Sequence, residues 1–115
     1  MKAGRAAFMV VALAALAACG ASSPAAKSEA PPANVAQTVD VRNIAFNPKS
    51  VTIHPGQTVA WKFDDGTIPH NVVGTDWRSP DRTSGYYTHT FAAPGTYAYR
   101  CTIHSNMDGQ VVVTP

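Results

Sequence analysis

The sequence predicts an all-β fold, an antiparallel β-sandwich of seven to eight strands with Greek-key connections. Short runs rich in β-branched and aromatic residues follow one another from about residue 37 to the C-terminus, and no long helical period interrupts them. Turn-forming pairs such as Pro55-Gly56 and Pro94-Gly95 separate these runs. The expected strands are residues 38–46, 50–54, 57–63, 71–75, 86–91, 96–101 and 110–114, and residues 75–84 are expected to form a long loop.

The N-terminal residues have the pattern of an export signal, which we place at residues 1–18. Lys2 and Arg5 supply its positive end, and the uncharged run at residues 6–18 is too short to span a bilayer permanently. The run ends in Leu16-Ala17-Ala18-Cys19, which resembles the lipobox of bacterial lipoproteins, so we expect lipidation of Cys19. This predicts an anchor on a bacterial membrane, facing the periplasm or the cell surface. The alternative is an ordinary signal peptide followed by a chance cysteine.

Residues 19–36 are expected to form a flexible, lipid-anchored tether, and residues 37–115 a single β-rich domain. The tether is rich in Ala, Pro and Ser and shows no apolar periodicity. The whole chain carries nine Lys and Arg against seven Asp and Glu, and loss of the signal leaves seven of each sign. This balance, without a basic run, gives no support for nucleic-acid binding.

The residues with the clearest chemistry surround Cys101, near the C-terminus. The period of two in residues 96–101 places Tyr97, Tyr99 and Cys101 on one strand face, which we expect to point inward. A short loop then carries His104, and Met107 follows just before the last strand. If Cys19 is acylated, Cys101 has no disulfide partner in an oxidising compartment, which favours a bound metal.

A second histidine is needed to complete a metal site, and His70 is the best candidate. It follows a turn-rich segment, and loops gather at the ends of a sandwich, so His70 can approach the loop after Cys101. Two imidazoles, a thiolate and a weak thioether suit one copper ion that alternates between Cu⁺ and Cu²⁺. Taken singly, each residue has a plainer interpretation: Cys101 a buried thiol, Met107 core filling, and each histidine a turn or loop residue.

The order His-Asn, then Cys-x2-His-x2-Met, resembles the plastocyanin family of cupredoxins, and the loop length resembles its amicyanin branch. The resemblance covers roughly residues 37–115. It implies that His70, Cys101 and His104 are equatorial ligands, that Met107 is the long axial ligand, and that Asn71 bridges the two ligand loops. The alternative for Asn71 is a simple turn residue. Ile103, Ser105 and Asn106 stand where the amicyanin loop has two Pro and a Phe, and Arg100 stands where plastocyanins have a Tyr.

The resemblance implies a one-electron carrier with a single type 1, or blue, copper. We expect a monomer that docks briefly with redox proteins near His104, where Ile103 and Pro69 are candidates for an apolar patch. We expect no substrate turnover, since no second metal cluster or open-site constellation is visible in the sequence. The main alternative is copper storage or delivery, and a metal-free interaction module is a further one.

Overall fold

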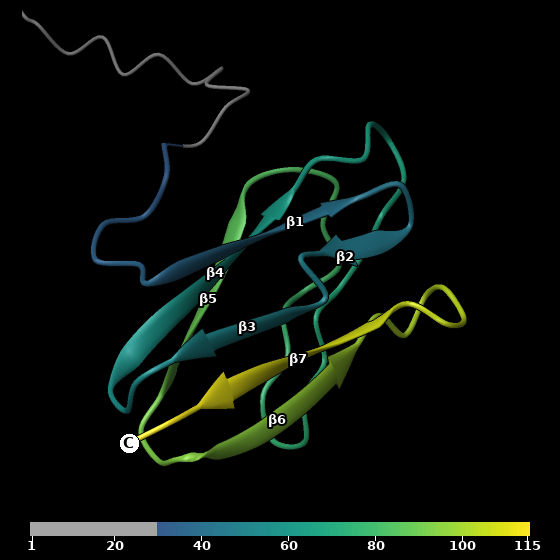
Figure 1. Ribbon diagram of the computed structural model, residues 1–115. Helices are drawn as coiled ribbons and strands as arrows, with labels where there is room; N and C mark the ends of the chain where they lie inside the picture. Colours follow the sequence, from purple (N-terminus) through teal and green to yellow (C-terminus); the bar gives the residue numbers. More distant parts are fainter. Residues whose placement is uncertain (1–29) are drawn as a thin grey trace, which may run out of the picture.

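The computed structural model describes residues 30–115, which form two β-sheets packed face to face (Figure 1). Seven strands make up the sheets: β1 Gln37–Arg42, β2 Ala45–Asn47, β3 Ser50–Ile53, β4 Gln57–Phe63, β5 Tyr86–Phe91, β6 Gly95–Arg100 and β7 Asp108–Val113. The first sheet has the order β2-β1-β4-β5, and the second has the order β3-β7-β6. The predicted all-β sandwich is therefore confirmed. Within these residues no helix is long and apolar enough to cross a membrane.

The expected signal at residues 1–18, the lipidation of Cys19 and most of the tether lie outside the described residues. These assignments stay predictions. The first strand, β1, begins at Gln37.

Not every strand pair is antiparallel, although the sequence analysis expected an antiparallel sandwich. β1 runs parallel to β4, and β3 runs parallel to β7, whereas β1–β2, β4–β5 and β6–β7 are antiparallel. The parallel pairs arise because the chain crosses between the two sheets before it returns beside an earlier strand, and parallel neighbours need such a crossover.

The core lies between the sheets and follows the period of two in the strands. In β1, Val39 and Val41 are fully buried, and in β4 the alternate residues Val59, Trp61 and Phe63 are buried as well. Parallel pairing sets Val39 opposite Trp61 and Val41 opposite Phe63, so large apolar side chains stack along one face of the first sheet. This packing provides the rigid base on which the loops at one end of the sandwich are held.

The expected strand at residues 38–46 is in fact a hairpin of β1 and β2. Asn43 and Ile44 adopt positive φ angles of 54° and 52° and turn the chain between them. A β-branched residue rarely adopts this conformation, so local preference gives no warning of a turn here. The backbone N–H of Ile44 donates a hydrogen bond to Oδ2 of Asp65 at 3.1 Å, which ties this turn to the loop after β4.

The expected strand at residues 71–75 is reduced to isolated bridges. Val73 pairs with both Arg78 and Arg100, and it exchanges two backbone hydrogen bonds with Arg100, at 2.8 and 3.0 Å. The chain turns directly afterwards, and the Gly74 N–H donates a hydrogen bond to the carbonyl oxygen of Trp77 at 2.8 Å. A Cβ on Gly74 would overlap the indole of Trp77, so only glycine fits at this position. The bridge to Arg100 fastens the segment after His70 to the residue before Cys101.

Candidate metal centre

Cys101 is the first residue after β6, and its side chain points into the protein as predicted. It is 3% exposed, as is Tyr99 on the same face. The Cys101 N–H donates a hydrogen bond to the carbonyl oxygen of Met107 at 2.9 Å, and β7 begins at the next residue, Asp108. Asn106, with φ of 60°, turns the chain back toward β7. The loop that carries His104 is thus closed at its base, and it is the yellow-green loop beyond β6 in Figure 1.

His70 reaches the same place from a different part of the chain. Its backbone exchanges hydrogen bonds with Arg82, at 2.9 and 2.8 Å, which pins the segment in a short antiparallel bridge. The side chain is 1% exposed and lies inside the loop end of the sandwich. His104, by contrast, is half-buried and borders a surface hollow of about 450 Å³ together with Thr102 and Ser105.

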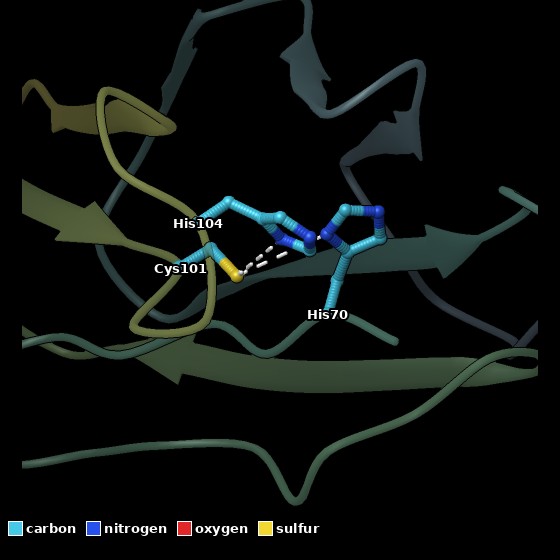
Figure 2. Close-up of side chains that lie close together, drawn as sticks. All are labelled: His70, Cys101 and His104. Atoms are coloured by element: carbon cyan, nitrogen blue, oxygen red, sulfur yellow. Dashed lines mark hydrogen bonds between the residues drawn. The ribbon is translucent and has the colours of Figure 1, made fainter. Parts of the chain in front are cut away.

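The structure brings three of the expected ligands together, as Figure 2 shows. Sγ of Cys101 lies 3.9 Å from Nδ1 of His70 and 3.7 Å from Nδ1 of His104. The ligand atoms all lie within 4.8 Å of one another, and among residues 30–115 this is the one such group of His, Cys and acidic side chains.

These separations fit a metal ion shared by the three side chains. Bonds of about 2.3 Å to sulfur and about 2.0 Å to nitrogen, opened to roughly 120°, separate the two donor atoms by about 3.7 Å. The observed distances from sulfur to nitrogen are 3.7 and 3.9 Å. One thiolate with two imidazoles in such a plane suits copper in an electron-transfer site. His70, Cys101 and His104 are therefore positioned to bind copper.

Met107 is 2% exposed and follows the ligand loop directly. Its carbonyl oxygen accepts the hydrogen bond from Cys101, so the backbones of the two residues lie side by side. Burial next to the ligand loop is compatible with the axial role that the resemblance implies for Met107.

Asn71 joins the two ligand loops through hydrogen bonds. Its Nδ2 donates to Oγ1 of Thr102 at 2.7 Å and to Oδ1 of Asp81 at 2.9 Å. Its Oδ1 accepts a bond of 2.8 Å from the Thr102 N–H. The residue after His70 is thus fastened to the residue after Cys101. The contact to Asp81 was not foreseen from the sequence.

Asp65 is a residue of the site that the sequence analysis did not single out. Its Oδ2 lies 2.8 Å from Nε2 of His70, and its side chain is 13% exposed. The hydrogen bond with His70 is the main cause that lowers the pKa of Asp65, and the bond from the Ile44 N–H adds to it. An acidic residue five places before a histidine, within a turn, carries no periodic signal by which this pair could have been found.

Two other histidines lie outside the site. His54 is exposed, and its Nδ1 lies 3.0 Å from the carbonyl oxygen of Thr114. His89 is half-buried and stacks on Trp77, with ring centroids 4.7 Å apart and planes 12° apart. Desolvation lowers the pKa of His89, partly offset by Asp76.

Comparison with known proteins places this geometry in a family. Amicyanin-alpha from Methylorubrum extorquens is 36% identical to the chain over 112 residues, which cover 90% of this chain and 92% of that protein. The chain belongs to the plastocyanin and amicyanin family of blue copper proteins. Plastocyanin from Scenedesmus fuscus is 31% identical over 86 residues, covering 61% of this chain and 87% of that protein.

Two further findings agree with this membership. The crystal structure of amicyanin from Paracoccus versutus matches with a TM-score of 0.63 and 32% identity, covering 73% of this chain and 85% of that one. Residues 33–85 match the family of copper binding proteins described as plastocyanin/azurin. That match includes His70 and ends before Cys101. Membership in the family, together with the His-Cys-His group, identifies a blue copper electron carrier.

Proposed function

We propose that this chain shuttles single electrons between extracytoplasmic redox proteins. The observation that carries the proposal is the approach of both histidine Nδ1 atoms to Sγ of Cys101 at the buried end of a rigid sandwich. The proposed ligands are His70, Cys101, His104 and Met107, of which the thioether of Met107 would be the weakest donor. Copper bound there would take up and release one electron by cycling between Cu²⁺ and Cu⁺.

The surrounding residues support this use by holding the ligands in fixed positions. The bridge between Val73 and Arg100 and the bonds between Asn71 and Thr102 connect the two ligand segments to each other. Ligands held in this way rearrange little when the charge of the ion changes, and a small rearrangement favours fast electron transfer. Hydrogen bonds of this kind also fix the orientation of metal-bound side chains.

His104 is the proposed point of electron entry and exit. It is half-buried and borders a surface hollow, whereas His70 is almost fully buried. Ile103 lies directly before His104 and is 40% exposed, and Ile68 lies two residues before His70 and is 37% exposed. Exposed apolar side chains and a small contact area suit a partner that binds briefly and leaves. Pro69, also exposed, is a further candidate for this patch.

We propose that Cys19 carries a lipid that keeps the domain at a bacterial membrane, outside the cytoplasm. The support is the sequence Leu16-Ala17-Ala18-Cys19 after an uncharged run. A flexible tether of the expected length, residues 19–36, would let the domain turn between partners while it stays near the membrane.

Copper storage or delivery is the alternative function for a site with these same ligands. Carriers that hand over copper need labile ligands at an accessible place, but Cys101 and His70 are 3% and 1% exposed. Met107 is the one methionine among the described residues, so no methionine cluster accompanies the site there. The buried thiolate therefore favours redox use over transfer of the ion.

The visible absorption spectrum of the copper-loaded chain tests the proposal. We expect an intense blue band that bleaches on reduction and returns on oxidation. Cys101→Ser should abolish the band and the reversible redox response, because a hydroxyl cannot replace the thiolate. A Cys101→Ser protein that stays blue, or a wild-type protein that binds copper without colour, would contradict the proposed electron-transfer site.

A further inference from the structure

We propose that Asp65 is a positioning residue of the metal centre, which fixes the tautomer of His70 and lowers the reduction potential. The inference rests on the proposed function, because it assigns a role to Asp65 at the same copper site. The proposed role of Asp65 is to orient the buried ligand His70, and the identity of the ligands alone does not determine that orientation.

The two nitrogens of His70 face different partners. Nδ1 is the atom 3.9 Å from Sγ of Cys101, whereas Nε2 lies 2.8 Å from Oδ2 of Asp65. An ionised carboxylate has no proton to donate, so the bond to Asp65 requires the ring proton to sit on Nε2. A neutral imidazole has one such proton, and its lone pair is then left on Nδ1. Asp65 thereby selects the tautomer that presents its lone pair toward Cys101.

Asp65 is itself held in place by hydrogen bonds from two other residues. The Ile44 N–H donates to the same Oδ2 at 3.1 Å, and the carbonyl oxygen of Asp65 accepts a bond of 3.0 Å from the Ile68 N–H. Ile44 makes its contact from the turn between β1 and β2, at a φ of 52°. A rare backbone conformation thus aims a donor at the carboxylate oxygen that binds His70. The carboxylate is therefore held between two segments of the chain, the turn at Ile44 and the segment that carries His70.

The charge of Asp65 also acts on the metal. A carboxylate on the far nitrogen of a ligand histidine raises the basicity of the ligand, and loss of such a partner typically weakens metal binding by about 10- to 100-fold. A nearby negative charge stabilises the more positive oxidation state more strongly. Asp65 is therefore expected to favour Cu²⁺ over Cu⁺, which lowers the reduction potential.

The chain contains a matched control in the preceding residue. Asp64 carries the same charge on the same loop, but it is exposed, and its side chain makes no hydrogen bond to His70. Asp64→Asn therefore removes an equal charge nearby without removing the contact. Asp65→Asn removes the charge and leaves an amide oxygen that can accept from Nε2, and Asp65→Ala removes both charge and acceptor.

The experiment compares the full chain with these three variants by voltammetry, by Cu²⁺ titration and by ¹⁵N NMR of the metal-free proteins. We expect Asp65→Asn and Asp65→Ala to raise the reduction potential and to weaken Cu²⁺ binding by about 10-fold or more, while Asp64→Asn stays close to wild type. In the metal-free chain the His70 ring should carry its proton on Nε2, and in Asp65→Ala the two tautomers should mix.

Equal potential shifts in Asp64→Asn and Asp65→Asn would overturn the proposal, since the effect would then be one of net charge alone. A metal-free Asp65→Ala protein with His70 still wholly in the Nε2–H form would also overturn it. Failure of the wild type to give a blue site would refute the proposed function instead, and the NMR comparison would still decide the pairing of Asp65 with His70.

Discussion

Asn71→Ala should destabilise the protein by about 3.5 kcal/mol. The substitution removes two bonds with Thr102, at 2.7 and 2.8 Å, and one with the carboxylate of Asp81, at 2.9 Å. A neutral hydrogen bond contributes about 1 kcal/mol net, and one to a charged group about 1.5–3 kcal/mol. Asp81 is exposed, so we take the low end for its bond. Thr102→Val is a milder variant for comparison, because it removes only the Oγ1 acceptor of one of these bonds and should cost about 1 kcal/mol.

Urea unfolding of the metal-free proteins measures this loss without a contribution from copper binding. The same variant should lose bound copper faster, because the segments that follow His70 and Cys101 are no longer joined by side-chain bonds. A loss below about 1 kcal/mol for Asn71→Ala, or a loss equal to that of Thr102→Val, would refute the view that Asn71 is the main link between the ligand loops.

Four other perturbations have defined outcomes. Met107→Leu should keep copper but raise the reduction potential, since a weak axial donor stabilises Cu²⁺, and voltammetry measures the change. If His104 takes up a proton on reduction, the potential should rise as pH falls, approaching about 59 mV per pH unit. Burial lowers the pKa of His89 from 6.5, so the unfolded chain binds more protons below that pH. Acidification should then reduce the free energy of unfolding, and His89→Gln should weaken this dependence in urea titrations. Cys19→Ser should leave export intact and abolish partitioning into detergent.

Each of these expectations has a contrary result. An unchanged potential in Met107→Leu would remove Met107 from the site, and a flat potential between mildly alkaline and mildly acidic pH would show that His104 stays bound after reduction. Equal acid sensitivity of wild type and His89→Gln would assign the effect to other groups. Equal detergent partitioning with and without Cys19 would mean that the lipobox interpretation is wrong.

The parts of the fold that follow regular alternation could be predicted from the sequence. β4 and β5 have the predicted bounds, because their apolar and polar residues alternate between clear turn signals. The turn at Asn43 and Ile44 could not be predicted, since an isoleucine at positive φ contradicts local preference and is held there by the rest of the fold. Residues 71–75 have the composition of a strand, yet they make only bridges, because the chain turns back after Val73 and pairs it with Arg78.

The candidate site also contains residues that the sequence predicts and residues that it does not. Three expected ligands meet because Cys-x2-His is a local pattern and because the loops of a sandwich gather at its ends. Asp65 and Asp81 were missed, since both contacts depend on the paths of loops rather than on any spacing in the sequence.

The closed base of the loop between Cys101 and Met107 has a consequence for how such proteins can diversify. The bond between these residues and the pairing of Arg100 with Asp108 seal the loop from the sandwich. Between them, Ile103, Ser105 and Asn106 face solvent, as does Thr102 apart from its bonds to Asn71. The exposed side chains of Ile103 and Ser105 can therefore change without disturbing the core, whereas Asn106 is constrained by its φ of 60°. If partners dock near His104 as proposed, changes at these exposed positions would alter partner choice while the buried ligands His70 and Cys101 stay in place.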